Sequence, residues 1–320
     1  MALLLSLVTL CCFLGSTQGQ LIEGFYSSTC PNAEQIVSSV VREAVSSDRN
    51  IAAVLLRLHF HDCFVQGCDG SILIDGSTAE KHAFGHQGVG GFEIIERAKT
   101  RLETVCQGVV SCADIMAMAA RDAIAVSNGP VYAVSTGRRD GRVSNISFAS
   151  DMPEVGESIQ SFKDKFRQKG LSEKDLVVLN AAHTIGTTAC FFMTERLYNF
   201  RGSGSADPTI NPTFLPELKA KCPQNGDVNV RLPIDRGSEN KFDSQVLKNI
   251  RDGFAVLQSD ASLYTDEETK RVIDSYFGFL STIIGPFFER DFVESMVKMG
   301  NIGVKTGSEG EIRRVCGAFN

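Results

Sequence analysis

The chain has 320 residues, of which 43% are hydrophobic and 22% charged, and its formal net charge at pH 7 is −6. This length is sufficient for a large core, in one big domain or in two lobes. The acidic balance, with no block of five like charges anywhere, argues against a nucleic-acid partner.

The first nineteen residues contain no charged side chain, and Ala2 to Leu14 form an apolar run. This pattern is typical of a secretory signal removed after Gly19, although the usual basic residues at its start are missing. A membrane anchor is the alternative, but the run is short for a span. We therefore expect a signal peptide over residues 1–19 and a mature chain over 20–320, with no membrane association after the signal is removed.

Eight cysteines remain after removal of the signal, and an even number in a secreted chain indicates disulfides. Sequence alone allows about 105 pairings of eight cysteines. Zinc is not expected, because no pair of cysteines two residues apart recurs. Asn145-Ile146-Ser147 is a glycosylation sequon, whereas the proline in Asn211-Pro212-Thr213 blocks a second one.

The hydrophobic pattern predicts helices, and a period of two is scarce, so the fold class is mainly α with very little β. Asn32 is expected to cap the first helix, with Gln35 at the capping-box position, and Ser172 with Asp175 to start a later one. Residues 76–91 and 202–216 are expected to be loops. The expected helices cover residues 32–46, a stretch around 51–64, 92–105, 112–122, 159–168, a stretch from 172 to about 180, 242–252, 266–281 and 287–299.

Arg57 and His61 are four residues apart on one of these helices and therefore share a face. A fixed cation and a titratable imidazole then point into the same space. An ordinary helix face is the alternative interpretation. His59 faces away from both and is interpreted as a core or surface histidine.

The stretch from Asp62 to Ser71, directly after this pair, carries oxygen-bearing groups at nearly alternate positions. Two carboxylates, a hydroxyl and loop carbonyls are the ligands that Ca²⁺ takes, and Gly67 permits the bend. The pattern predicts a catalytic helix that a metal-bound turn holds rigid. A second oxygen-rich stretch contains Asp235, Ser238 and Asp243.

His183 is expected near the end of the helix that Ser172 starts, among small residues such as Ala182 and Gly186. It is either a satisfied core histidine or one whose small neighbours leave room for a large, flat group. Asp260 carries no signal of its own and, from the residues alone, is interpreted as a surface acid.

Five motifs in this order resemble those of the secreted plant (class III) haem peroxidases, and the similarity covers essentially all of the mature chain. The motifs are Phe25-Tyr26 through Cys30-Pro31, Arg57-Leu58-His59-Phe60-His61-Asp62-Cys63, the run from Cys112 to Asp122, Gly137-Arg138-Arg139-Asp140-Gly141, and Ala182-His183-Thr184-Ile185-Gly186.

The resemblance implies a two-lobed helical fold with one haem b between a distal half (about 20–150) and a proximal half (about 151–320). Arg57 and His61 would be the catalytic residues, and His183 would bind the iron through Nε2. Asp260 would accept the Nδ1 proton of that ligand. His86 stands where the family usually has the asparagine that accepts a hydrogen bond from the distal histidine.

The resemblance also implies two calcium ions, four disulfides and a donor channel lined by Pro153. The implied distal calcium ligands are Asp62, Val65, Gly67, Asp69 and Ser71, with Glu80 acting through water. The implied proximal ligands are Thr184, Asp235, Ser238, Lys241 (by its carbonyl) and Asp243. The implied disulfides join Cys30 to Cys106, Cys63 to Cys68, Cys112 to Cys316, and Cys190 to Cys222.

The implied function is a monomeric, secreted peroxidase of the cell-wall space that reduces hydrogen peroxide and oxidises phenolic or other small aromatic donors. The departure at His86 leads to the hypothesis that peroxide reaction is lost at a higher pH than in asparagine-bearing relatives. Two other interpretations compete: a haem protein of low activity that serves as a wall-binding module, and a calcium-dependent binding protein without haem.

Overall fold

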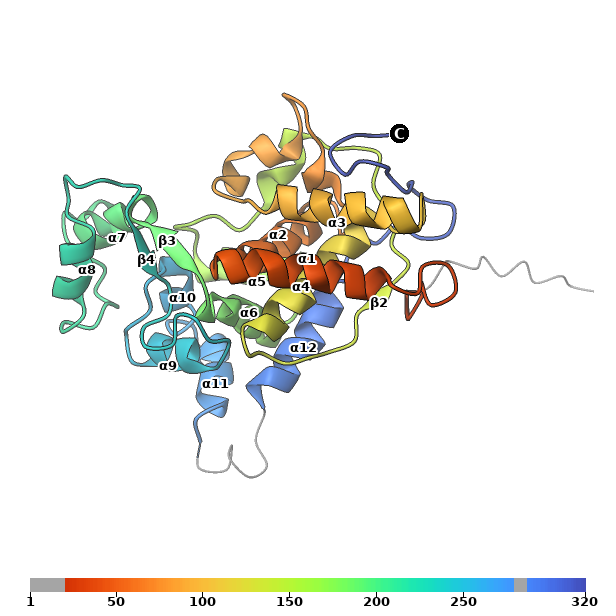
Figure 1. Cartoon of the computed structure of the whole chain (residues 1–320). Coiled ribbons are helices and arrows are strands. Elements are labelled where there is room, and N and C mark those ends of the chain that lie inside the picture. Colours follow the sequence, from red (N-terminus) through yellow and green to blue (C-terminus); the bar gives the residue numbers. More distant parts are fainter. Residues whose placement is uncertain (1–20, 279–286) are drawn as a thin grey trace, which may run out of the picture.

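The computed structural model describes residues 21–278 and 287–320, and it confirms that the fold is mainly α (Figure 1). The signal peptide and residues 279–281 of the helix expected over 266–281 lie outside the described residues. Within the described ranges, no helix is long and apolar enough to cross a membrane. The longer helices are α1 (Ala33–Ser47), α2 (Ile51–Val65), α3 (Phe92–Val105), α4 (Cys112–Val126), α5 (Ile159–Gln168), α6 (Glu173–Asn180), α11 (Glu267–Ser275) and α12 (Phe288–Met299).

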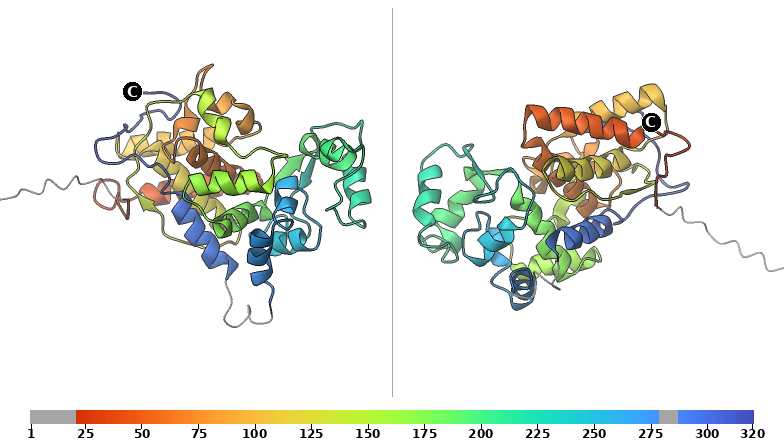
Figure 2. Two further views of the ribbon diagram at one scale, coloured as in Figure 1. Left: turned by 180° about the vertical axis from the view of Figure 1, so that it is seen from behind. Right: turned by 60° about the horizontal axis from the view of Figure 1, so that its bottom comes forward.

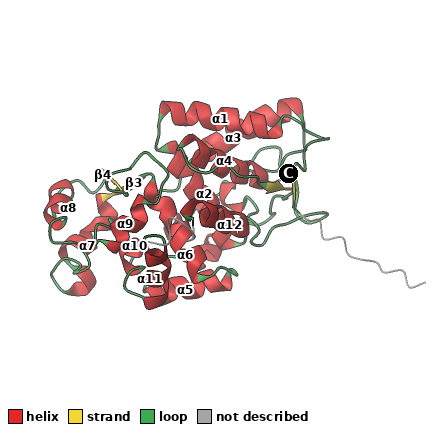
Figure 3. Ribbon diagram, turned by 90° about the horizontal axis from the view of Figure 1, so that it is seen from below, coloured by secondary structure: helices red, strands yellow, loops and turns green. Residues whose placement is uncertain are grey.

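The remaining elements are short, and most connect or cover the longer helices (Figure 3). Strand β1 (Ile22–Glu23) pairs antiparallel with β2 (Ser135–Thr136), and β3 (Thr187–Ala189) pairs antiparallel with β4 (Arg231–Pro233). The short helices are α7 (Thr194–Tyr198), α8 (Leu215–Lys221), α9 (Gln245–Arg251) and α10 (Gln258–Ser262). The loop expected over 202–216 therefore ends where α8 begins, and α9 is shorter than the predicted helix over 242–252.

The two predicted helix caps have different outcomes. Ser172 and Asp175 form a full capping box at the start of α6, as predicted. Asn32 makes no side-chain cap hydrogen bond, so the predicted cap of α1 is wrong. The backbone at Asn32 has φ −95° and ψ 7°, far from the extended conformation that aims a cap side chain at the first helical N–H groups.

Helix α4 lies at the centre of the larger core and is buried on nearly every side. Ser111 caps it by accepting from the N–H of Asp114. Its alanines allow α2 and α1 to approach closely, and α3 completes this group of helices (Figure 2). Met116 and Met118 are buried core residues, as the sequence predicts.

The same core continues into a second group of helices, in which α6 packs against α5, α11 and α12. Residues from both predicted halves of the chain therefore share one apolar core. A smaller core lies under α7, α8 and the β3–β4 pair, at the left of Figure 1. Its centre includes the buried Arg196, whose Nε donates to Asp207 over 2.9 Å.

Four disulfides join the pairs that the family resemblance implies: Cys30 to Cys106, Cys63 to Cys68, Cys112 to Cys316, and Cys190 to Cys222. The second closes the turn after α2, and the third connects residues 204 apart in sequence. A closed loop of that length removes much of the conformational freedom of the unfolded chain.

Buried ion pairs connect the segments that follow α4. Asp114 accepts from the hydroxyl of Tyr26 (2.6 Å), from the N–H of Gly137 (2.7 Å) and from Nη1 of Arg138 (2.8 Å). Arg138 also donates to the carbonyl of Gly300. The start of the motif Gly137-Arg138-Arg139-Asp140-Gly141 is thus part of a buried junction with segments distant in sequence.

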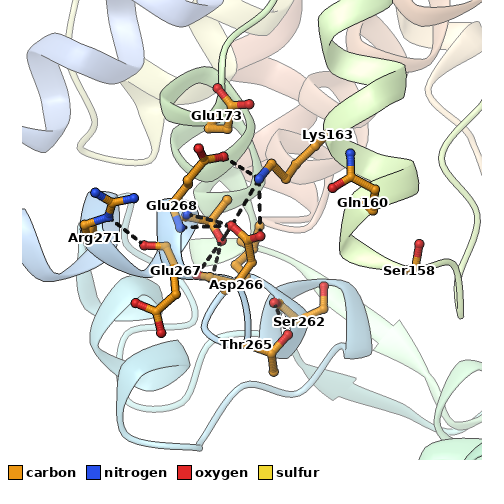
Figure 4. A network of polar contacts seen from close by, with 12 residues as sticks. Ser158, Gln160, Lys163, Glu173, Ser262, Thr265, Asp266, Glu267, Glu268 and Arg271 are labelled. Carbon is orange, nitrogen blue, oxygen red and sulfur yellow. Dashed lines mark hydrogen bonds and ion pairs between the residues drawn. The ribbon is translucent and has the colours of Figure 1, made fainter.

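An ionic network connects α5 to α11 (Figure 4). Nζ of Lys163 lies 3.2 Å from Oδ2 of Asp266 and 2.5 Å from Oε2 of Glu268. Asp266 also caps α11 by accepting from the N–H groups of Glu268 and Thr269. Because the Lys163 side chain is only 7% exposed, its removal leaves a partly buried carboxylate without its cation.

We expect Lys163→Met to lower the free energy of unfolding by about 1–2 kcal/mol, since the methionine keeps the volume and loses the charge. The measurement is thermal unfolding of the variant beside the parent. The matched control is Arg167→Met on the same helix, because Arg167 is 59% exposed and its ion pairs with Asp164 and Glu173 are open to solvent. Equal stability of all three proteins would show that the network contributes nothing.

Candidate active site

Helix α2 presents Arg57 and His61 on one face, as the four-residue spacing predicts. Nε of Arg57 donates to Nε2 of His61 over 3.1 Å, and Nη2 of Arg57 donates to the carbonyl of Gln87 over 3.1 Å. Arg57 is an exposed residue. Desolvation by the protein atoms around it, and then the charge of Arg231, lower the pKa of Arg57 to about 10, so that it remains a cation at neutral pH.

A chain of hydrogen bonds fixes the positions of the protons on two imidazoles. Arg57 can only donate, so Nε2 of His61 is an acceptor and the His61 proton sits on Nδ1. That Nδ1 lies 2.8 Å from Nδ1 of His86, which must therefore accept. His86 then carries its own proton on Nε2, a buried atom with no hydrogen-bond partner among the described residues.

Both imidazoles are held neutral. Burial, with Arg57 and His86 as further causes, lowers the pKa of His61 well below its usual value. Burial and then Arg57 lower the pKa of His86 to about 4. At neutral pH His61 is therefore an unprotonated acceptor at Nε2, and its lone pair accepts the hydrogen bond from the permanent cation Arg57. His59 is buried and faces Cys63 instead, which fits its interpretation as a core histidine.

His183 lies in the 3₁₀ turn η5 (Ala181–Thr184), directly after α6. Its Nδ1 is 2.8 Å from Oδ1 of Asp260 on α10. Asp260 is 1% exposed, so its interpretation as a surface acid is wrong. The short α10 is too brief for a hydrophobic pattern to reveal burial. Nε2 of His183 makes no hydrogen bond within the described part of the chain and is available to a ligand.

Close backbone contact brings η5 to the helix that carries His61. Gly186 has φ +98°, and a Cβ built on it would lie 2.6 Å from Cβ of Ala53 at the start of α2. Only glycine allows this approach. The small residue Gly186 thus allows the segment after His183 to lie against α2. Ala53, which it contacts, is four residues before Arg57 and so lies on the same face of α2 as Arg57 and His61.

The predicted distal oxygen ligands lie together and are buried. Asp62 accepts from the N–H of Gly70, and Asp69 accepts from the N–H of Ser71. Burial raises the pKa of Asp62, and the charges of Asp69 and Glu80 raise it further. We refer to Asp62, Asp69, Ser71 and Glu80 as the distal cluster.

The distal cluster has the chemistry of a cation site. Burial raises the pKa of Glu80 to about 7, with Asp69 adding to this effect. Oγ of Ser71 lies near this carboxylate, but neither it nor the two Glu80 oxygens makes a hydrogen bond of normal geometry within the described residues. Buried oxygens without donors fit a bound Ca²⁺. Val65 ends α2, and Gly67 packs so closely on Gly303 that no Cβ would fit.

The predicted proximal ligands are also brought together. Oγ1 of Thr184 donates to Asp235 over 3.1 Å and contacts the carbonyl of Lys241 at 3.3 Å. Oγ of Ser238 lies 2.7 Å from Asp235 and 3.0 Å from Asp243. Burial raises the pKa of Asp235 to about 6. Side-chain and backbone oxygens from two segments, the one with Thr184 and the stretch 235–243, therefore converge next to His183.

Two further predicted residues lie beside the turn that carries His86. Pro153 is half-buried just after the 3₁₀ helix η4 (Ile146–Asp151), which packs on η3 (Phe84–His86). The side chain of Asn145 caps η4 by accepting from the N–H and hydroxyl of Ser147. Reasoning from the sequence missed Lys305 and Lys169, which contact Asp69 and Val65 from distant segments, and no local pattern points to either.

The geometry defines a class of protein: a helical protein in which an arginine–histidine pair lies on a helix that contacts the turn of a second histidine, which a carboxylate orients. The family model described as peroxidase matches residues 37–278. The chain is 66% identical to Peroxidase 43 of Arabidopsis thaliana, covering 100% of this chain and 98% of that protein. It is 56% identical to Peroxidase 13 of the same plant (96% and 95% covered) and 52% identical to Peroxidase N1 of Nicotiana tabacum (93% and 90% covered).

The chain therefore belongs to the plant peroxidase family of class III, and it is a peroxidase. Members of this family generally bind haem, use hydrogen peroxide and oxidise a reducing substrate. Membership excludes the interpretation as a binding protein that is not an enzyme.

We expect His86→Asn to move the acid limb of the peroxide reaction to lower pH. His86 is neutral above about pH 4 and cationic below it. The cationic ring cannot accept the hydrogen bond from His61, and its charge disfavours a positive charge on His61. The parent rate constant should thus fall as the pH drops through about 4, whereas an asparagine does not titrate. Rapid-mixing kinetics with peroxide from pH 3 to 8 measure both profiles.

The matched control for this prediction is His82→Asn, because His82 is exposed on the neighbouring 3₁₀ turn η2 (Glu80–His82). Its profile should coincide with that of the parent. A His86→Asn profile that also coincides with the parent would contradict the predicted role of His86.

Proposed function

We propose that this chain is a secreted peroxidase with one haem b and two calcium ions, which reduces hydrogen peroxide to water and oxidises phenolic or other small aromatic donors one electron at a time. The observation that carries the proposal is the hydrogen-bonded pair of Arg57 and His61 on α2, next to the His183–Asp260 pair. The signal at residues 1–19 and the sequon at Asn145 support a location in the cell-wall space.

His61 acts as the acid–base group in this proposal. Its Nε2 would take one proton from hydrogen peroxide and return it to the outer oxygen, so that this oxygen leaves as water; the two electrons that the cleavage needs would come from the bound haem. The neutral state of His61 at physiological pH supports this role, since only the neutral ring can accept a proton. The acceptor at His86 keeps the imidazole in the required tautomer.

Arg57 stabilises the negative charge that develops as the oxygen–oxygen bond breaks. A fixed cation aimed at such a charge in an enclosed site contributes about 3–4 kcal/mol, by analogy with oxyanion donors. The hydrogen bond to the carbonyl of Gln87 supports the guanidinium in place. Because this bond already restricts the Arg57 side chain, less conformational entropy is lost when peroxide binds.

His183 would hold the haem iron through Nε2, because its Nδ1 is already engaged by Asp260. When bound, haem supplies the one-electron redox chemistry. Asp260 increases the basicity of His183 by accepting its Nδ1 proton. The distal half (about 20–150) and the proximal half (about 151–320) would then each contribute one histidine.

The two oxygen clusters would each hold one Ca²⁺ ion. Asp62, a proposed ligand of the distal ion, directly follows His61, and Thr184, a proposed ligand of the proximal ion, directly follows His183. Both ions would therefore stiffen the segments that carry the histidines. Aromatic donors would enter beside Pro153, where Phe84 is 72% exposed on the neighbouring turn. We further propose that the mature protein is a monomer.

We expect His61→Leu to slow the reaction with hydrogen peroxide by about 10²–10⁴-fold and Arg57→Leu by about 10²–10³-fold, because each removes one named contribution. The measurement mixes the haem-loaded mature protein with one equivalent of peroxide and follows the Soret band, then adds a phenol. His82→Leu, an exposed histidine, is the matched control and should react like the parent.

A parent protein whose Soret band peroxide barely changes would overturn the proposed function. In that case the interpretation as a haem protein of low activity would replace it. A His61→Leu variant as fast as the parent would instead show that another group accepts the peroxide proton.

A further inference from the structure

One lysine side chain reaches the distal cluster, and a second reaches the end of α2 that leads into it, both from segments distant in sequence. Nζ of Lys305 lies 2.5 Å from Oδ2 of Asp69, and the ammonium of Lys169 donates to the carbonyl of Val65 over 2.7 Å. The backbone of Lys305 is itself fixed, because its carbonyl accepts from the N–H of Arg139. Neither lysine takes part in the proposed chemistry, so their convergence on one site needs a separate explanation.

Lys305 is the cation that pairs directly with a carboxylate of the distal cluster. Asp69 is 2% exposed and Lys305 30% exposed, so the ammonium approaches from the solvent side. Oδ1 of Asp69 is occupied by the N–H of Ser71, which leaves Oδ2 for Lys305. The buried Arg313 also lies close, but it donates to the carbonyls of Gly70, Gly141 and Cys316.

The distal cluster needs positive charge even without a metal ion. Three carboxyl groups, those of Asp62, Asp69 and Glu80, are buried together in the distal cluster. A lysine in contact with one of them reduces their mutual repulsion. The same ammonium repels a dication that enters the cluster, and it occupies one of the oxygens that such an ion attracts.

We propose that Lys305 is a built-in counterion of the distal cluster, which keeps the cluster folded when calcium is withdrawn and lowers its affinity for calcium. This inference rests on the proposed distal calcium site. The loss of calcium from this site then has a limited structural cost, since a cation remains on Asp69. Lys169 donates to the carbonyl of Val65, at the end of the helix that precedes the distal cluster.

The test compares the haem-loaded mature protein with its Lys305→Met and Lys305→Arg variants after calcium has been removed by a chelator. Calcium affinity is measured by competition with a calcium-sensitive dye, and thermal unfolding is followed in excess chelator and in saturating calcium. The matched control is Lys174→Met, because Lys174 also pairs a partly exposed ammonium with a buried carboxylate, that of Asp291, but in the α6–α12 contact.

We expect Lys305→Met to raise the calcium affinity of one class of sites about tenfold or more, because the variant no longer has a cation that repels the calcium ion. In excess chelator, the melting temperature of Lys305→Met should lie further below that of the parent than the melting temperature of Lys174→Met does. Saturating calcium should reduce the difference between Lys305→Met and the parent. Lys305→Arg, which keeps the charge, should behave like the parent in both measurements.

Two results would overturn the inference and are distinguishable from each other. If the parent and Lys305→Met bind calcium with equal affinity, the distal site stands and Lys305 is not its counterion. If the parent binds no calcium at all, the proposed calcium site is wrong and the inference fails with it.

Discussion

The hydrogen bond from Arg57 to His61 is the constraint on which the chemistry of this peroxidase depends. An arginine cannot accept, so this one contact determines where the protons lie on His61 and, through it, on His86. The geometry of α2 makes the contact possible, because residues four apart face the same way. Everything that positions α2 therefore also positions the lone pair that would receive the peroxide proton in the proposed function.

Several separate features hold α2 in place. Its N-terminal part packs against the segment after His183, where Gly186 permits contact with Ala53. Its C-terminal end leads into the distal cluster and the disulfide between Cys63 and Cys68. Buried carboxylates serve a similar purpose elsewhere, since Asp114 joins the N-terminal segment to the turn at Arg138. Rigid placement of the reactive pair thus comes from polar and covalent contacts as much as from the apolar core.

Helices such as α3 and α5 could be predicted from the sequence because each buries a stripe with a period of 3.6 residues. Helices α7, α8 and α10 were missed, because five to seven residues make too few turns to show a clear period. Helix α9 is as short, and its predicted bounds were too long. The Arg57–His61 face was predictable from spacing alone. The role implied for Asp260, the pairing of cysteines and the second ligand set depended on the family resemblance, because their partners lie far away in sequence.

The link between Cys112 and Cys316 has a consequence for biosynthesis. Because 204 residues separate the two cysteines, α4 cannot receive its covalent partner until nearly the whole chain has left the ribosome. Lys305, which contacts Asp69, and Arg313, which donates to the carbonyl of Gly70, belong to the same late segment. Until this segment is made, local packing would have to maintain the helix that carries Arg57 and His61, without the tail that packs on the turn after it.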